Sequence, residues 1–263
     1  MNPASSTIPL SSSAPASRPA LRRSQINASL LVTRQILRQA GVALPRWADW
    51  TKDDWRATGT ETREIRECML GWDVTDFGSG RFEQLGRTLF TLRNGRTHSP
   101  LFGKSYSEKL LIEPEGQRSP MHYHRSKRED IINRLGGNIL VALHPVAADG
   151  QPGDTPLGVQ VDGISRTVPA GEPIRLAPGE SLCIPPHTYH QFWAEEGTGI
   201  PLDGKRYTIS SEVSSVCDDW NDNVFVDPWA KRFPEIIEDE PGQIYLCHEY
   251  PALPGDADGA AIS

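Results

Sequence analysis

The sequence contains little cysteine and no long hydrophobic run. Its 263 residues include four cysteines, at positions 68, 183, 217 and 247, with no CxxC spacing. So sparse a set excludes a disulfide framework and favours a reducing compartment. No apolar stretch approaches the roughly 20 residues of a membrane-spanning helix. We therefore expect a soluble, cytoplasmic protein with no membrane partner.

Basic surfaces are also scarce. The net charge is −7 and the pI is about 5.5, and no cluster of basic and aromatic residues stands out. This balance argues against a phosphate-binding surface and excludes nucleic acid as the expected partner. With 37% hydrophobic residues, a chain of this length can bury a full core, and we expect a single domain.

Both ends of the chain differ in composition from the middle. Residues 1–23 are rich in Ser, Pro and Ala and contain arginines but no acidic residue. This composition is typical of a flexible tail or of an organelle transit peptide, and we favour the tail. The expected organisation is an N-terminal tail at 1–23, one domain at 24–251, and a second flexible tail at 252–263.

The middle of the chain changes from helical to strand-like patterns. Apolar spacing predicts a helix from Ser24, as its cap, to near Gly41, and a second helical stretch from Thr62 to Leu70. Short β-type runs follow, separated by Gly and Pro, which is typical of a barrel or sandwich. These runs cover 72–77, 88–92, 109–113, 138–143, 181–184 and 206–213. The segment 220–251 is expected to wrap the barrel or to reach a partner subunit.

The most informative motif is Gly116-x5-His122-x-His124-x4-Glu129-x6-Gly136. Alternate side chains of a strand share a face, so His122 and His124 point the same way. Glu129 reaches that face if the chain turns between them. A second motif follows with Gly179, Pro185 and, four residues after Pro186, His190, which offers a fourth ligand.

The ordered pair of motifs resembles the two signature motifs of the cupin superfamily. That resemblance implies a metal site of three His and one Glu inside a small β-barrel. The second motif departs at His187, where the family usually has Gly, and at Ala194, where it usually has Asn. The expected fold is an all-β core, a cupin (double-stranded β-helix or jelly-roll) barrel, with N-terminal helices.

A site of three imidazoles and one carboxylate leaves two adjacent open positions on an octahedral ion. Such a site suits Mn, Fe, Co or Ni better than a closed structural zinc site does. Two open positions can hold neighbouring sugar oxygens, so that the metal polarises a carbonyl and stabilises an enediolate.

Isomerisation of an aldose also requires a base that moves a proton between carbons. The strand at 206–213 places Arg206, Thr208, Ser210 and Glu212 on one face, and Glu212 is the natural base if that face lines the cavity. Lys109, on the strand that leads into the first motif, can hold a sugar oxygen. The alternatives are an exposed strand carboxylate at Glu212 and an ordinary surface cation at Lys109.

A narrower resemblance covers roughly residues 25–250. The segments that carry it are Glu108 to Ile112, Met121 to His124, Lys127 to Asn133, Gly136-Gly137, Glu212-Val213-Ser214 and Asp218 to Asn223. Together they resemble the cupin-type D-lyxose ketol-isomerase family. The resemblance includes the lysine, the metal set and the Glu-Val-Ser strand in order.

The resemblance implies a Mn-dependent homodimer that interconverts D-lyxose and D-xylulose, often with D-mannose and D-fructose as secondary substrates. By motif, His122, His124, Glu129 and His190 bind metal, Lys109 contacts substrate, and Glu212 moves the proton. Asp222 and Arg232 are candidates for holding sugar hydroxyls, or else solvated loop charges. Phe192 or Trp193 forms an apolar wall against the sugar or fills the core.

Three other functions use a similar site. A cupin dioxygenase would use the open positions of iron for O2 and an organic substrate, but it needs no lysine. A non-catalytic sugar-binding cupin would keep the barrel and leave Glu212 idle. A phosphosugar isomerase would need a cationic phosphate clamp, for which only Lys109 and Arg206 are visible in the sequence.

Overall fold

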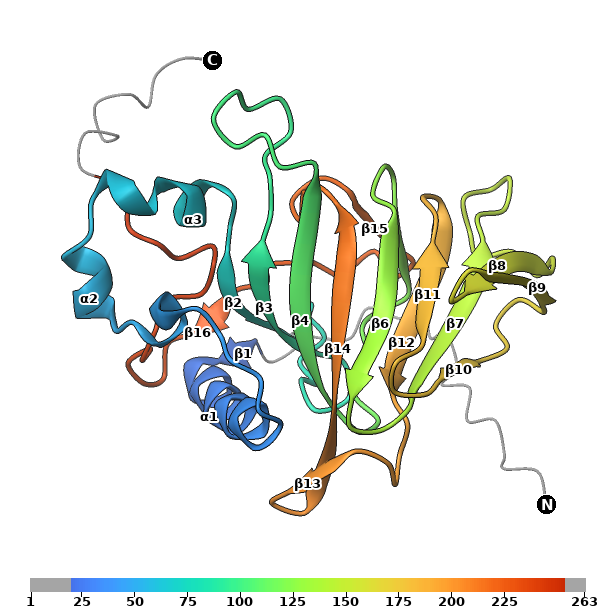
Figure 1. Cartoon of the computed structure of the whole chain (residues 1–263), viewed down its shortest axis with the longest axis horizontal. Coiled ribbons are helices and arrows are strands. Elements are labelled where there is room, and N and C mark those ends of the chain that lie inside the picture. The colour runs from blue at the N-terminus through green and yellow to red at the C-terminus, as the bar shows by residue number, and fades with distance from the viewer. Residues whose placement is uncertain (1–19, 254–263) are drawn as a thin grey trace.

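The computed structural model describes residues 20–253, which form a β-rich body with helices at one end (Figure 1). The α-helices are α1 (Arg23–Gln39), α2 (Lys52–Arg56) and α3 (Arg63–Glu67), with 3-10 turns at Arg46–Asp49 and Thr60–Thr62. The strands are β1 (Leu21–Arg22), β2 (Gly71–Thr75), β3 (Arg87–Arg93), β4 (Tyr106–Pro114), β5 (His122–His124), β6 (Glu129–Leu135), β7 (Ile139–Pro145), β8 (Leu157–Val161), β9 (Ile164–Val168), β10 (Ile174–Leu176), β11 (Ser181–Ile184), β12 (Thr188–Ala194), β13 (Ile200–Leu202), β14 (Lys205–Ser215), β15 (Asn223–Phe225) and β16 (Ile236–Ile237).

The strands form two large sheets. The larger sheet has the order β2-β3-β4-β14-β6-β11-β8-β9, with β13 paired to β14. The smaller has the order β10-β7-β12-β5-β15. Neighbouring strands within each sheet run antiparallel, and strands far apart in sequence lie side by side, as β4 and β14 do. This arrangement agrees with the expected all-β barrel and N-terminal helices.

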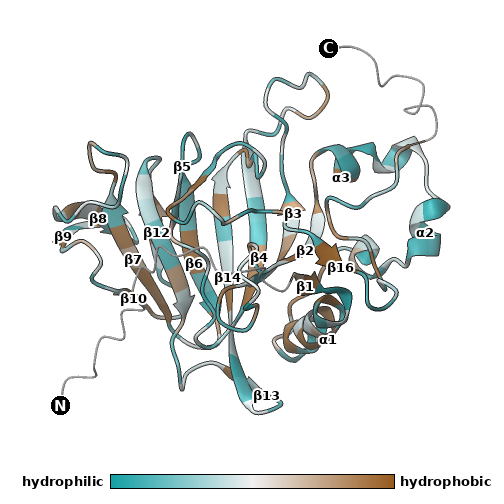
Figure 2. Ribbon diagram, turned by 180° about the vertical axis from the view of Figure 1, so that it is seen from behind, coloured by the Kyte–Doolittle hydropathy of each residue, from teal (hydrophilic) through white to brown (hydrophobic). Residues whose placement is uncertain are grey.

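Two hydrophobic cores lie on opposite faces of the larger sheet. Leu111 and Ile131 of this sheet pack inward with Val141 and Phe192 of the smaller sheet. Ile112, next to Leu111, points outward into the core that contains α1. Because alternate strand residues face opposite sides, the central strands are apolar on both faces. In Figure 2, β7 is largely brown, whereas the edge strand β9 is teal.

Helix α1 begins slightly earlier than expected, and its cap differs from the prediction. The N-cap is Arg22, paired with Gln25, and Ser24 lies inside the first turn. Asp239 supplies the missing acceptor, because the Ser24 backbone N–H donates to Oδ1 at 3.0 Å and the hydroxyl donates to Oδ2 at 2.8 Å. The prediction that Ser24 caps the helix was therefore wrong, because Asp239, more than 200 positions away, accepts the hydrogen bonds at the start of the helix.

The second helical stretch is shorter than expected. It contains a 3-10 turn at Thr60–Thr62 and then α3 over Arg63–Glu67 only. The chain leaves the helix at Met69 (φ 53°) and Gly71 (φ 111°), both with left-handed backbone, where β2 begins. Each of the six expected strands overlaps an observed one, namely β2, β3, β4, β7, β11 and β14.

The C-terminal segment wraps around the body, which was one of the two expectations for residues 220–251. β15 extends the smaller sheet beside β5, and β16 pairs in parallel with β1. Further on, the Cys247 N–H donates to the Trp72 carbonyl at 2.7 Å, which holds the chain beside β2. Residues 20–23 belonged to the expected tail, but here Leu21 and Arg22 form β1 and Arg23 opens α1. Residues 1–19 and 254–263 lie outside the described residues. None of the described helices combines the length and apolar character that crossing a membrane requires.

Candidate active site

Three histidines from the smaller sheet meet at one end of the barrel interior. His122 and His124 lie on β5, and His190 lies opposite His122 on the neighbouring strand β12. One nitrogen from each ring lies within 4.8 Å of the others. The period-2 spacing of the first motif and the pairing of the two strands therefore bring all three rings to one point, as the sequence predicted.

Backbone carbonyls orient two of these rings. The Pro120 carbonyl lies 2.8 Å from His122 Nδ1, and the Thr188 carbonyl lies 3.0 Å from His190 Nδ1. A carbonyl can only accept, so each Nδ1 carries the proton and each Nε2 keeps a free lone pair. This tautomer is the one that binds a metal ion through Nε2.

Two of the histidines, His122 and His124, are held neutral. Burial lowers the pKa of His122 well below its usual value, and the neighbouring imidazoles lower it further. Burial, reinforced by the cation of Lys127, also lowers the pKa of His124. Both rings are therefore neutral at physiological pH, which is the state that ligates a metal.

Glu129 reaches the same point from the opposite sheet. It is the first residue of β6 and is 2% exposed. Its Oε1 lies 2.9 Å from His190 Nε2, and its Oε2 lies 3.4 Å from His124 Nε2. Burial would raise the pKa of Glu129, but the cation of Lys127 is the main opposing influence, and the pKa is held well below its usual value. The carboxylate is ionised and faces the histidine nitrogens.

Lys127 is a site residue to which the sequence analysis assigned no role. Its Nζ lies 2.6 Å from Glu129 Oε2 and 2.6 Å from Glu212 Oε1, and the residue is 3% exposed. Burial would lower the pKa of Lys127, yet the two carboxylates raise it well above its usual value. One ammonium thus links the candidate metal ligand to the candidate base. The sequence held a local indication of this role, because Lys127 stands two residues before Glu129 where the chain enters a strand, and alternate residues of a strand share a face.

Glu212 and Lys109 lie side by side on adjacent strands of the larger sheet. They are direct partners in the register of β14 and β4, and Lys109 Nζ lies 4.0 Å from Glu212 Oε1. Both are buried and line the cavity, so neither is an exposed strand carboxylate or a surface cation. Burial favours the neutral form of Glu212, but Lys127 and Lys109 together lower its pKa.

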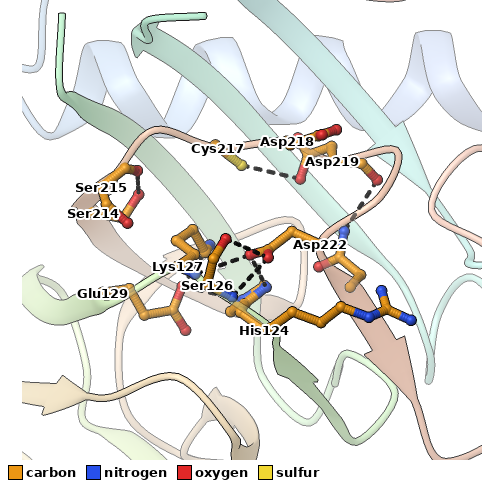
Figure 3. A network of polar contacts seen from close by, with 12 residues as sticks. His124, Ser126, Lys127, Glu129, Ser214, Ser215, Cys217, Asp218, Asp219 and Asp222 are labelled. Atoms are coloured by element: carbon orange, nitrogen blue, oxygen red, sulfur yellow. Dashed lines mark hydrogen bonds and ion pairs between the residues drawn. The ribbon is translucent and has the colours of Figure 1, made fainter. Parts of the chain in front are cut away.

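A partly buried anion holds the Lys109 ammonium in place. Its Nζ donates to Asp219 at 3.2 Å and to Cys217 Sγ at 2.9 Å. Burial opposes the charge, but Asp219 and the other nearby groups raise the pKa of Lys109. Figure 3 shows Asp219 and Cys217 on the loop that follows β14. Asp219 is a second functional residue to which no role was assigned.

The rest of the predicted polar face does not line the cavity. Arg206, Thr208 and Ser210 are absent from its walls. Arg206 Nη1 donates to the Gly199 carbonyl at 3.1 Å instead. Six residues of strand span about 20 Å, so Arg206 lies at the far end of β14 from Glu212. The expectation that the whole face lines the site was wrong.

The structure places Asp222 and Arg232 in different surroundings. The Asp222 carboxylate accepts hydrogen bonds from Ser126 N, Ser126 Oγ and Lys127 N, at 2.7 to 3.1 Å, and lies 3.6 Å from His124 Nδ1 (Figure 3). Asp222 therefore lies next to the candidate metal ligand His124 but does not line the cavity. Arg232 does line the cavity, where it pairs closely with Asp73 and lies 3.5 Å from Asp219.

Other cavity walls combine apolar surface with paired charge. Phe192 belongs to the inner core and also lines the cavity, with the Arg87 guanidinium 4.3 Å from its ring centre. Trp193 points to the other face, where Arg118 lies over it. Arg87 is paired with buried Glu113 at 2.5 Å. Phe192 therefore both lines the cavity and belongs to the hydrophobic core.

The two departures from the usual second motif leave the ligand in place. His187 adopts a left-handed backbone with φ 58°, a conformation that glycine takes most easily. Its N–H donates to the His124 carbonyl at 2.9 Å, which fixes the turn beside β5. Ala194 is buried at the end of β12. His190 enters the site despite both substitutions.

Comparison with known proteins decides the family. The model of the family described as D-lyxose isomerase matches residues 21–250. The chain belongs to the D-lyxose isomerase family. It is 45% identical, over 88% of its length and 98% of the relative's, to a D-lyxose/D-mannose isomerase of Escherichia coli O157:H7, and 44% identical over the same shares to one of Serratia proteamaculans. Membership at this level of identity makes the chain a sugar isomerase.

Solved structures support the fold of this family member. L-ribose isomerase of Cellulomonas parahominis with L-ribose superposes with a TM-score of 0.54 at 18% identity, covering 84% of this chain and 100% of that one. The enzyme of Acinetobacter sp. DL28 gives 0.54 at 15%, covering 85% and 100%. At such identities the likeness concerns the fold alone, and it confirms an all-β cupin-type barrel with N-terminal helices.

Proposed function

We propose that this isomerase interconverts D-lyxose and D-xylulose through an enediol, with D-mannose and D-fructose as further substrates. The observation that carries the proposal is the position of Glu212, an ionised carboxylate in the cavity wall between two lysines and close to the histidine cluster. The names of the relatives from Escherichia coli and Serratia proteamaculans support the choice of sugars.

The proposal includes a divalent metal held by His122, His124, Glu129 and His190. Their donor atoms fit such an ion, because His190 Nε2 and Glu129 Oε1 are buried without a hydrogen-bond partner among the described residues. The N and O donor set favours Mn, with Fe, Co or Ni as alternatives. When bound, the ion polarises the sugar carbonyl and stabilises the charge that develops on its oxygen.

Glu212 moves the carbon-bound proton in this proposal. Its carboxylate takes the proton from C2 of the aldose, and the resulting carboxylic acid returns it to C1, while the hydroxyl proton on O2 passes to O1 to give the ketose. The lowered pKa keeps the base ionised before the reaction. Lys127 fixes one oxygen, Oε1, at 2.6 Å, which leaves the other oxygen to face the sugar. Proton transfer by a group positioned in this way contributes about 10²–10⁴-fold.

Lys109 and Arg232 hold the sugar. The Lys109 ammonium, anchored by Asp219, donates a hydrogen bond to a sugar oxygen and stabilises negative charge on it. Arg232 donates to a hydroxyl farther along the chain of the sugar. Asp222, by contrast, orients the 126–127 backbone and faces His124 Nδ1, so we assign it a positioning role in place of sugar binding.

The charges of the cavity argue against a phosphosugar. Its four cationic side chains, Arg87, Lys109, Lys127 and Arg232, each have a carboxylate partner within the described residues. A phosphate clamp needs cations that are free to pair with the ligand. The charged side chains that line the cavity also disfavour the dioxygenase alternative. The ionised Glu212, with Lys109 and Lys127 beside it, disfavours a sugar-binding protein without activity.

The family resemblance adds two further parts to the proposal. We propose that the enzyme works as a homodimer and in the cytoplasm. Light scattering of the purified chain tests the first part, and fractionation of the source cells tests the second.

An anaerobic assay tests the activity and its metal requirement together. The protein is stripped with chelator, Mn is restored, and the conversion of D-lyxose to D-xylulose is followed without O2. We expect turnover only after Mn is added. Turnover that needs O2 would indicate the dioxygenase, and turnover that is complete in the stripped protein would remove the metal from the mechanism.

The variant Glu212→Gln separates chemistry from metal binding in the same assay. It should keep its metal and lose turnover by about 10²–10⁴-fold. Turnover at the wild-type level with full metal would remove Glu212 from the mechanism. No turnover of lyxose or mannose by the metal-loaded wild type would show that the substrate is misassigned.

A further inference from the structure

A second group of metal-ligating side chains lies where the C-terminal segment packs against β2. Asp73 comes from β2, and Cys247 and His248 follow each other in the C-terminal segment. One ligand atom from each lies within 4.8 Å of the other two. These three residues, called the β2 cluster below, share no member with the lining of the active-site cavity.

The backbone holds the β2 cluster together without a ligand. The Cys247 N–H donates to the Trp72 carbonyl at 2.7 Å, next to Asp73. A turn fixes the following residues, because the Glu249 N–H donates to the Leu246 carbonyl at 2.9 Å and the Leu246 N–H donates to the Glu249 carboxylate at 2.9 Å. Leu246 itself is fully buried in the core. The three side chains therefore sit in a preformed arrangement.

Several polar atoms of the β2 cluster have no hydrogen bond. Asp73 Oδ1 and His248 Nδ1 are buried and lack a hydrogen-bond partner within residues 20–253. Asp73 is 1% exposed. Buried polar atoms are almost always hydrogen-bonded, so such a group needs an explanation. The ion pair with Arg232 involves Oδ2 and leaves Oδ1 unpartnered.

The three donor types match one class of ion. A thiolate, an imidazole and a carboxylate are the ligands that zinc takes in proteins, and three of them leave a fourth position for water. Cys247 and His248 also line a surface cavity with Met69, Trp220 and Tyr250, which gives an ion a way in. Sulfur ligands disfavour Mn and Mg, so this site and the His and Glu site select different metals.

We propose that Asp73, Cys247 and His248 form a second metal site, which binds a thiophilic divalent ion such as Zn²⁺ with water as a fourth ligand. Binding replaces the thiol proton of Cys247, which is released to solvent. The ion ties the C-terminal segment to β2. It also competes with Arg232 for Asp73, and Arg232 lines the active-site cavity.

Cobalt distinguishes this site from the active site. The full-length protein is stripped with chelator and titrated with Co²⁺. The active-site ligands are nitrogen and oxygen, so only the β2 cluster should give a thiolate-to-cobalt charge-transfer band in the near ultraviolet. We expect two equivalents of Co²⁺ per chain, with the band belonging to one of them, and displacement of that equivalent by Zn²⁺.

Cysteine variants test the assignment. Cys247→Ser should lose the band and one equivalent while it keeps the Mn-dependent isomerase activity. Cys183→Ser, on β11 and outside the cluster, is the matched control and should keep both. His248→Gln, a partly exposed position, should weaken Co²⁺ binding at least tenfold and serves if Cys247→Ser does not fold. A single equivalent without a band in the wild type, or a band that persists in Cys247→Ser, would overturn the proposal.

Discussion

Replacing Lys127 by Met should change the pH dependence of the reaction. The lysine makes two buried ion contacts of 2.6 Å, to Glu129 and to Glu212. At an effective dielectric constant of about 20, each contact corresponds to about 6 kcal/mol of Coulomb attraction before desolvation is subtracted. Breaking such a buried pair costs about 3–5 kcal/mol. The variant should therefore be destabilised, and Lys109 should remain as the main cation that lowers the pKa of Glu212.

The sign of the pH effect follows from the cause of the pKa shift. Lys127 is the principal group that lowers the pKa of Glu212 against burial. Without it, that pKa rises and the base is protonated over a wider acid range. The acid limb of the kcat/KM profile for D-lyxose should move up by about 1–3 pH units. The loss of rate should be largest in acid and should recover as the pH rises.

The measurement needs two controls. Activity is expressed per bound metal, because Glu129 also loses its partner and metal content falls with it. Lys205→Met removes an exposed lysine that pairs with Glu83, and it should leave both the profile and the stability unchanged within about 1 kcal/mol. An unmoved acid limb in Lys127→Met at equal metal content would refute the assignment of Lys127 as the group that sets the charge of Glu212.

Three further predictions concern metal binding and packing. His190→Ala should lower metal content and activity in parallel, as plasma emission spectroscopy and the isomerase assay would show; normal metal content would remove it from the ligands. Asp222→Asn should weaken Mn binding by about 10–100-fold, because Asp222 faces the ring nitrogen of the ligand His124 that does not bind metal. Excess Mn should restore activity, and an unchanged Mn titration would contradict this prediction. Gly137→Ala should destabilise the fold by about 1–3 kcal/mol in urea unfolding, since its Cβ would lie 2.2 Å from Thr198 Oγ1. Gly158→Ala, with no atom within 4 Å, is the control and should unfold like the wild type.

Local patterns explain which parts of the site were predictable. The alternation of His122 and His124 needs only a strand, and the structure has β5 at that place. Glu212 and Lys109 were proposed from their positions on expected strands, and the resemblance then placed both in order along the chain. Lys127 carried a similar local signal, two residues before Glu129, but a buried ammonium is costly unless carboxylates surround it. The second carboxylate, Glu212, lies 85 positions away, and no spacing rule connects the two.

Long-range pairing explains what the sequence did not indicate. The role of Asp219 depends on its contact with Lys109, which is made only after β4 and β14 pair. The cap of α1 by Asp239 depends likewise on β1 meeting β16. The mistaken role of Arg206 has a different origin. Alternation tells which face a side chain takes, but it does not tell how much of a long strand a cavity occupies.

The charges of the active site explain why so many ionisable groups are buried there. Four cations of the cavity, Arg87, Lys109, Lys127 and Arg232, face five carboxylates, namely Glu113, Asp219, Glu212, Glu129 and Asp73. His122 and His124 contribute no charge because burial keeps them neutral. The network is thus one positive charge short of balance, and a divalent ion among the histidines would turn the deficit into an excess of one. Proton transfer to Glu212 moves one negative charge from that carboxylate to the enediolate, so the net charge of the site stays the same and the excess positive charge would favour the enediolate. Preorganised charge of this kind stabilises the transition state more than the bound sugar, which is the condition for catalysis.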